Sequence, residues 1–165
     1  MLSTRGVYLK DDANGYTEAY DKVFPEQWGK PVRTWLPFFE QRPFLAGTFA
    51  WTGFDYRGEP APCAKWPCIN SNFGILDMCG FPKDNFYYCQ TWWTSQTVLH
   101  ILPHWNWPGK EGTEIEVWCY SNCEGVELLL NRKSLGRKPM EKYGHLAWMV
   151  PYAPGVLEAR GYKGG

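Results

Sequence analysis

Residues 114–121 read EIEVWCYS, and apolar and polar side chains alternate along this stretch. Successive side chains of a β-strand point to opposite sides, so Ile115, Val117 and Cys119 share one face of a predicted strand. Further apolar sets of the same kind, the last of them weaker, occur at Val98–Pro103, at Val126, Leu128 and Leu130, at Leu146, Trp148 and Val150, and at Leu157, Ala159 and Gly161. Turn signals separate these four or five strands, which predicts an antiparallel β-sandwich with hairpins.

The sandwich predicted from these strands is incomplete, because immunoglobulin-like domains usually need about seven strands. One predicted hairpin turns at Leu130-Asn131-Arg132-Lys133. Asn-Gly is the favoured pair for a type I′ turn, and Arg132 in a left-handed conformation would cost roughly 1 kcal/mol. The sequence therefore leaves open a turn of another type.

N-terminal to the sandwich, residues 44–51 (FLAGTFAW) form a nearly continuous apolar run. Such a run predicts a strand buried on both faces, as in a parallel sheet. Asp84 is a plausible N-cap for a helix over Asp84–Trp93, and a shorter helix is predicted near Thr34–Gln41. A strand, a long loop and a helix in this order are half of a βα repeat. We place the domain boundary near Gln96, which gives domains of 1–95 and 96–165.

Composition narrows the class of ligand. Lys+Arg and Asp+Glu are both 17, so the formal net charge is zero, and a nucleic-acid partner is disfavoured because phosphate binding needs a basic surface. The chain holds 10 Trp, 10 Tyr and 9 Phe. Their apolar faces suit sugar rings, although most single aromatic side chains are expected to pack a core or an interdomain seam.

The six cysteines form no CxxC pair and have no partners at zinc-site spacing. We therefore expect mostly reduced, apolar cysteines and neither a metal site nor a cofactor. The sequence contains no visible signal peptide and no apolar stretch long enough to span a membrane, so it does not indicate a compartment.

Three unusual aromatic-rich segments agree in order and spacing with one family. They are GTFAWTGFDYRGEP (47–60), INSNFGILDMCGFPKDNFYYCQTWW (69–93) and VLHILPHWNWPG (98–109). They resemble the end of the catalytic barrel of glycoside hydrolase family 2, in the β-galactosidase branch, and the immunoglobulin-like domain after that barrel. The resemblance implies an α+β chain in two parts: the C-terminal portion of a (β/α)8 TIM barrel, then a partial immunoglobulin-like β-sandwich.

This resemblance implies a retaining mechanism with two carboxylates roughly 5–5.5 Å apart. Both are glutamates in the family. Neither matched position lies in this chain, because Ser3–Tyr8 resembles the family's segment shortly downstream of the nucleophile. Glu59 lies beyond the predicted strand, where barrel active sites form, but a solvated or salt-bridged loop carboxylate is the favoured interpretation. We therefore predict no catalytic residue in this chain.

The predicted substrate-binding residues are Trp51, Asp55, Asn72 and Phe73. Trp51 ends the strand at the face where the matching tryptophan lines the sugar subsite, although packing of the barrel top is the competing interpretation. Asp55 is expected to hold its loop through hydrogen bonds. In the related β-glucuronidases an Asn-x-Lys pair binds the sugar carboxylate, and an ungapped match puts Ser71 and Phe73 there. Without that cation we expect a neutral hexose, although Lys65 could reach in.

Two hypotheses remain for the function. The first is a segment of an exo-acting β-galactosidase-like enzyme that hydrolyses terminal neutral β-hexosides, with a carbohydrate substrate and the rest of a parent polypeptide as partners and neither nucleic acid nor membrane. The second is a non-catalytic carbohydrate-binding or adaptor module.

Overall fold

A computed structural model describes residues 2–3, 32–47, 49–58, 70–71 and 74–164. The chain divides into two compact units, Met1–Cys89 and Gln90–Gly165. The elements that begin in the first unit are β1 (Leu2–Ser3), α1 (Val32–Glu40), β2 (Ala50–Trp51), β3 (Tyr56–Arg57), β4 (Asn70–Ser71) and α2 (Asp84–Trp93). The positions expected for a domain boundary and for the two domains stay predictions.

Helix α1 confirms the helix predicted near Thr34–Gln41. Its rings at Trp35, Phe38 and Phe39 pack on one another, with centroids 5.6 to 6.0 Å apart. The Gln41 amide closes the last turn on the Pro37 carbonyl at 3.2 Å. The guanidinium of Arg42 then covers the Phe38 ring, 3.9 Å from its centroid. Aromatic packing and this cation therefore stabilise the C-terminal end of the helix.

The strand predicted over 44–51 is wrong in its length and burial. Among the described residues of this range, 44–47 and 49–51, only Ala50–Trp51 is a strand, and it pairs in parallel with Leu2–Ser3. The Leu45 amide instead bonds the Arg42 carbonyl in a turn, and Gly47 has φ of 137°. Phe44 and Phe49 are 80% and 91% exposed. Apolar sequence alone does not make a buried strand, because a strand also needs ladder partners along its length.

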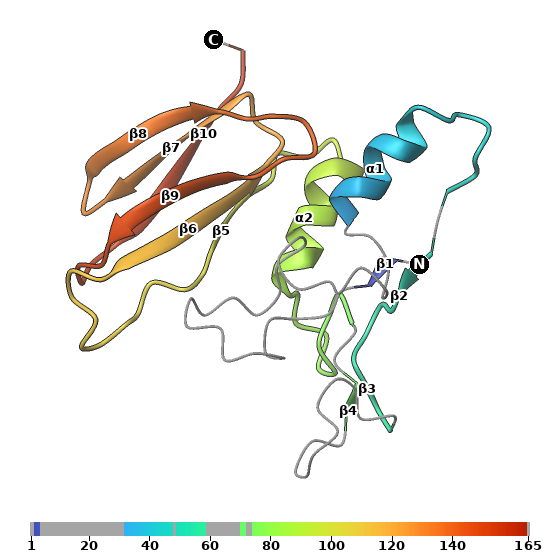
Figure 1. Cartoon of the computed structure of the whole chain (residues 1–165), viewed down its shortest axis with the longest axis horizontal. Helices are drawn as coiled ribbons and strands as arrows, with labels where there is room; N and C mark the ends of the chain where they lie inside the picture. Colours follow the sequence, from blue (N-terminus) through green and yellow to red (C-terminus); the bar gives the residue numbers. More distant parts are fainter. Residues whose placement is uncertain (1, 4–31, 48, 59–69, 72–73, 165) are drawn as a thin grey trace. The chain divides into compact units, whose positions relative to one another are not determined.

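The second unit holds two antiparallel three-stranded sheets, drawn face to face in Figure 1, with orders β5-β6-β9 and β10-β7-β8. Their strands are β5 (Leu99–Leu102), β6 (Glu114–Ser121), β7 (Gly125–Leu130), β8 (Lys133–Pro139), β9 (Leu146–Pro151) and β10 (Leu157–Tyr162). The five predicted strands are confirmed. Strand β8 was not among the predicted strands, because its residues, KSLGRKP, do not alternate between apolar and polar.

The sandwich core lies between these sheets. It is built from the apolar sets that the alternation predicted, namely Val117, Cys119, Val126, Leu128, Leu146, Trp148 and Val150. The opposite face of β6 is also buried, because Trp118 and Tyr120 are 2% and 0% exposed. Trp118 packs on His145 with centroids 4.1 Å apart. Strand β6 is thus buried on both faces, as the central strand of its sheet.

The hairpin between β7 and β8 turns through Asn131 and Arg132, whose φ values are 51° and 66°. Positive φ at both central residues is the type I′ geometry, so the alternative of another turn type is wrong. The side chain of Asn131 connects the turn to residues 154–156 through two hydrogen bonds. Its amide Nδ2 donates to the Pro154 carbonyl at 3.1 Å, and its Oδ1 accepts from the Val156 amide at 2.9 Å.

Helix α2 confirms the helix predicted from Asp84. At its C-terminal end Trp92 meets the ring of Tyr143, with centroids 5.1 Å apart. The described residues contain one parallel strand pair, β1 and β2, and no closed barrel. They also contain no helix long and apolar enough to cross a membrane. The structure thus shows an α+β chain with two antiparallel three-stranded sheets.

Candidate functional site

The backbone immediately after Trp51 is paired with a second loop. The amides of Ile75 and Leu76 donate to the carbonyls of Thr52 and Gly53, both at 2.9 Å, and the Asp55 amide donates to the Leu76 carbonyl at 3.0 Å. Residues 52–55 and 75–76 therefore run side by side. This pairing fixes the chain at the point where it leaves the predicted sugar-binding strand.

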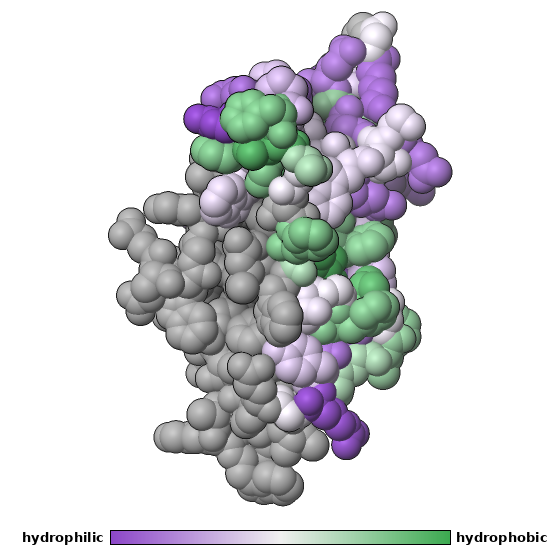
Figure 2. Space-filling view, turned by 90° about the vertical axis from the view of Figure 1, so that its right-hand side faces the viewer, coloured by the Kyte–Doolittle hydropathy of each residue, from purple (hydrophilic) through white to green (hydrophobic). Residues whose placement is uncertain are grey.

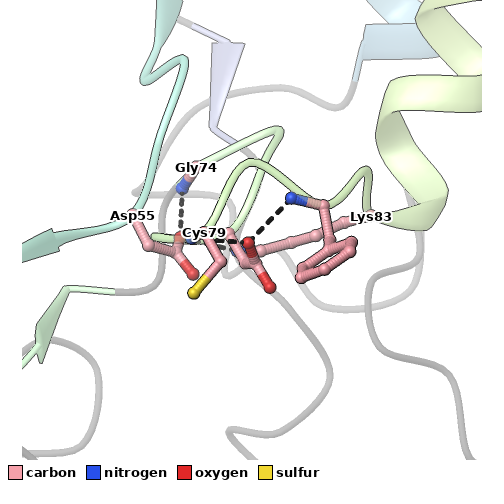
Figure 3. A network of polar contacts seen from close by, with 6 residues as sticks. Asp55, Gly74, Cys79 and Lys83 are labelled. Carbon is pink, nitrogen blue, oxygen red and sulfur yellow. Dashed lines mark hydrogen bonds and ion pairs between the residues drawn. The ribbon is translucent and has the colours of Figure 1, made fainter.

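Asp55 ties the two loops together through one carboxylate oxygen. Its Oδ1 accepts the Gly74 amide at 2.7 Å and the Lys83 ammonium at 2.6 Å (Figure 3). The side chains of Lys83 and Asp55 are only 10% and 8% exposed. An ion pair shielded in this way is stronger than one in water. These contacts are the kind that Asp55 needs for its expected role of holding the loop. Its contact with substrate stays a prediction.

Gly74 leaves no room for a side chain. A Cβ at this position would lie 2.2 Å from both the Asp55 amide nitrogen and the Leu76 carbonyl oxygen. Contacts of that length to backbone atoms force the chain to move. Glycine is thus required where the amide of residue 74 approaches the Asp55 carboxylate.

Asp77 organises the next turn of the chain. Its Oδ1 accepts the amides of Cys79 and Phe81, each at 2.8 Å. The Asp77 amide donates to the Phe81 carbonyl at 2.9 Å, and Gly80 has φ of 86°. Side-chain bonds of this kind replace a ladder and hold the turn closed. The turn holds the exposed residues Met78 and Cys79 at the surface.

Lys83 and Asp77 were not among the predicted site residues. Lys83 is 28 residues from Asp55 in sequence, and no local pattern connects them. The GFPKD stretch at 80–84 marks the loop, but it does not reveal the partner of its lysine. Of the predicted substrate-binding residues, Trp51 ends β2 and Asp55 holds the loop, whereas Asn72 and Phe73 lie outside the described residues, as does Glu59.

In the part of the chain that the structure describes, no three His, Cys, Asp or Glu side chains gather as a metal site would need. Each histidine packs on an aromatic ring instead: His100 on Tyr120, His104 on Trp107 and His145 on Trp118. The thiols of Cys79, Cys119 and Cys123 are free. Burial raises the pKa of Cys119 to about 12, helped by the neighbouring Cys123.

A second polar cluster lies on the sheet of β7, β8 and β10. Glu127 accepts the hydroxyl of Ser134 at 2.6 Å and that of Tyr162 at 2.7 Å. The Ser134 hydrogen bond, followed by that of Tyr162, lowers the pKa of Glu127, and the Glu127 hydrogen bond raises the pKa of Tyr162. Arg137 covers the Tyr162 ring at 4.0 Å. These groups satisfy one another, which is typical of a structural network.

Comparison with known proteins finds relatives that cover both units. Residues 112–165 match a family described as a domain of unknown function, DUF4982. The β-galactosidase BoGH2A of Bacteroides ovatus is 40% identical over 175 residues, covering 95% of this chain. Other relatives, from Formosa agariphila and Bacteroides fragilis, are described as β-glucuronidases, two of them as putative. This chain spans only 20% of the length of the Bacteroides ovatus relative.

Two solved structures are similar in fold and sequence. A β-glycosidase from Bacteroides vulgatus matches with a TM-score of 0.79 and 43% identity, covering 92% of this chain and 19% of its own. A glycosyl hydrolase family 2 member from Bacteroides cellulosilyticus matches with a TM-score of 0.73 and 33% identity, covering 79% of this chain and 22% of its own. The similarity thus reaches across the first unit as well as the sandwich.

Proposed function

Because the chain is a relative of the family 2 glycoside hydrolases, we propose that it acts as part of a retaining, β-galactosidase-like enzyme. In this role it forms the last portion of the catalytic (β/α)8 barrel and the first portion of an immunoglobulin-like domain. The observation that carries the proposal is the parallel pairing of β2 with β1, which ends at Trp51. The chain then enters the loop secured by Asp55 and Lys83.

The role proposed for this chain, sugar binding without catalysis, follows from where barrel enzymes have their active sites. Substrate binds at the C-terminal ends of the strands, in the loops attached there. Trp51 is the last residue of β2, and residues 52–55 are held by the second loop. In the proposed enzyme Trp51 floors the sugar subsite, and the two catalytic glutamates come from the rest of the polypeptide.

Exposed apolar side chains in the first unit support the proposal that other parts of the enzyme cover it. Phe44 and Phe49 are 80% and 91% exposed, and Phe38 is 37% exposed. Apolar side chains also gather at the surface on the face drawn in Figure 2. Large exposed apolar patches mark surfaces that another element covers. In the proposed enzyme the remaining barrel strands and helices cover Phe44 and Phe49.

The proposed substrate is a terminal neutral β-hexoside. Ser71 and Phe73 stand where the related β-glucuronidases have the Asn-x-Lys pair. A sugar carboxylate needs a cation to bind tightly. In a complete enzyme that contains this chain, the double substitution Ser71→Asn and Phe73→Lys should therefore raise kcat/KM for a β-glucuronide and lower it for a β-galactoside. Equal changes on both substrates would contradict this specificity.

The proposed function is tested in a hybrid enzyme. In the hybrid, this chain replaces the stretch of the Bacteroides ovatus β-galactosidase that matches 95% of it. We expect the hybrid to hydrolyse nitrophenyl β-galactoside and the isolated chain to be inactive. A folded hybrid without activity would contradict the proposal. So would turnover by the isolated chain that is lost in Glu59→Gln.

A further inference from the structure

We propose that the outer edge of β10 takes a seventh strand, antiparallel to it, from another part of the parent polypeptide. This inference rests on the proposed function, in which the chain is a segment of a longer enzyme, and adds the surface that joins the sandwich to the rest. Immunoglobulin-like sandwiches usually have about seven strands, and the described part of the second unit holds two sheets of three. Among the described strands, β10 pairs only with β7 and is the last strand of its sheet.

Alternate residues of β10 direct their backbone groups away from β7. In an antiparallel pair, a residue bonds the partner strand with both of its backbone groups or with neither, in alternation. The Val156 carbonyl accepts the Asn131 amide at 2.9 Å. The Tyr162 carbonyl accepts the Glu124 amide at the same distance. The even-numbered residues of β10 therefore face β7, and the odd-numbered residues face the open edge. The amides and carbonyls at this edge are those of Leu157, Ala159 and Gly161.

The sandwich core is less well covered at β10 than at β9, which also ends a sheet. The core side chains of β9 are all 8% exposed or less. Leu157 and Ala159 of β10 pack against the same core but are only partly buried. Leu99 of β5, whose Cδ1 would lie 3.8 Å from a Cβ on Gly161, is 37% exposed. The sandwich is thus closed beside β9 and open beside β10.

The other three edges are less suited to a further strand. At β9, the ammonium of Lys138 donates to the Ala147 carbonyl at 2.6 Å and lies 5.1 Å from the centroid of the Trp148 ring. Strand β8, KSLGRKP, has three basic residues, no acidic residue and a proline, features that protect an edge from pairing. Strand β5 is only four residues long. The six residues of β10 are therefore the edge best able to pair.

A strand of the parent polypeptide suits this edge better than a second copy of the chain. A row of backbone donors and acceptors at strand spacing is satisfied by another strand. Gly164 has φ of 73°, in the left-handed region that tight hairpin turns use, so the polypeptide can return antiparallel along β10. A segment tethered through such a turn is held beside β10 at a high effective concentration, which a second copy lacks.

Hydrogen exchange resolved to single amides tests this pairing in the isolated chain and in the hybrid enzyme. The amides of Ala159 and Gly161 should exchange more slowly in the hybrid, by about tenfold or more, because they donate to the seventh strand. The amides of Glu158 and Arg160 face β7 and should be protected in both proteins, as internal controls. Equal exchange rates of Ala159 in the two proteins would overturn the proposal. Protection in the hybrid that depends on protein concentration would assign the edge to a second copy instead.

Two proline substitutions in the hybrid sharpen the test. Ala159→Pro removes an amide that faces the open edge, so Gly161 should lose its added protection. Met149→Pro is the matched control on β9. The Tyr152 amide donates to the Thr113 carbonyl at 2.8 Å, so by the same alternation the Met149 amide faces the free side of β9. This control should leave Gly161 protected, and unchanged protection in Ala159→Pro would contradict the seventh strand.

The exchange experiment does not depend on turnover, which separates this inference from the proposed function. A folded hybrid that protects Ala159 but hydrolyses no glycoside contradicts the proposed function and supports the seventh strand. An active hybrid in which Ala159 exchanges as fast as in the isolated chain contradicts the seventh strand alone.

Discussion

The ammonium of Lys83 lies 2.6 Å from Asp55 Oδ1, and the same oxygen accepts the Gly74 amide at 2.7 Å. Both charged side chains are about nine-tenths buried, at 10% and 8% exposure. Two loops separated by an intervening segment of the chain are thus joined at one carboxylate. We therefore expect the loops beyond Trp51 to depend on this pair for their position.

Removing the lysine should loosen that junction. Lys83→Met leaves the Asp55 carboxylate shielded from water without its counter-charge, a change that costs roughly 3 kcal/mol for a buried pair. We expect hydrogen exchange at the Gly74 amide of the chain to accelerate by about a hundredfold. Lys163→Met, which removes a lysine bonded to Thr97 at an exposed site, is the control. Unchanged protection of Gly74 would show that the ion pair does not hold the loops.

The β7–β8 hairpin carries strain that glycine would relieve. Arg132 has φ of 66°, and a residue with a Cβ pays roughly 1 kcal/mol in this region. Arg132→Gly should therefore raise the unfolding free energy of the sandwich by about 0.5–1 kcal/mol, less than the full strain because glycine is also more flexible when unfolded. Urea unfolding followed by the amide signals of β7 measures this, and a lower midpoint would contradict it.

Gly155 should respond in the opposite direction. Its φ is 140°, and a Cβ there would lie 1.8 Å from Asn131 Oδ1. Gly155→Ala should push Asn131 away from the Val156 amide and destabilise the sandwich by about 2 kcal/mol or more. The same urea experiment checks it. Gly136→Ala is a matched control with a similar backbone strain (φ 102°) but open space around its Cβ.

Acid should weaken the Glu127 cluster. Hydrogen bonds from Ser134 and Tyr162 lower the pKa of Glu127 below its usual value of 4.5. A lowered folded pKa adds stability above the unfolded pKa, and that stability is lost as the pH falls through the folded value. We expect Glu127→Gln to flatten the loss of stability below about pH 4.5. Identical acid limbs for Glu127→Gln and the unaltered chain would rule out this linkage.

The buried thiols should resist alkylation. Burial raises the pKa of Cys119 to about 12, so its reactive thiolate is scarce near neutral pH. Cys79 is exposed, whereas Cys119 and Cys123 are buried. Iodoacetamide labelling and then peptide mass spectrometry should show Cys79 modified in the folded chain and Cys119 only after denaturation. Comparable labelling of both in the folded chain would contradict the burial of Cys119.

The sandwich was predictable because its signal is local. In β6 the alternation of Ile115, Val117 and Cys119 matches the buried face residue by residue. Strand β8 was not predicted because it is an edge strand, and an exposed edge strand does not need alternating apolar side chains. Its partner β7 and the turn at Asn131 and Arg132 define it instead.

The first unit was harder to predict because its structure depends on distant partners. The apolar run at 44–51 has the composition of a buried strand, but of the residues that the structure describes there, only Ala50–Trp51 pairs with a neighbouring strand. The Asp55–Lys83 pair joins residues 28 positions apart, which no local pattern reports. Helix α2 was predictable from Asp84 and the helical spacing after it, because a helix start is again a local signal.

The central proposal is that this chain supplies the sugar-binding end of a β-glycosidase, and it rests on Trp51. In the hybrid, Trp51→Ala should remove stacking on the apolar sugar face, at a cost of roughly 1–3 kcal/mol in transition-state binding. That corresponds to about a tenfold to hundredfold loss in kcat/KM. Trp51→Phe should retain much of the activity, because a smaller ring still offers a face.

The decisive measurement is kcat/KM per folded molecule of the Trp51→Ala hybrid on nitrophenyl β-galactoside, with its melting temperature taken on the same preparation. Our account predicts a loss of about tenfold or more at a nearly unchanged melting temperature. A core-packing role predicts the reverse, a melting temperature lower by several degrees and an unchanged kcat/KM. An unchanged kcat/KM in the well-folded Trp51→Ala hybrid would contradict the account and remove Trp51 from the site.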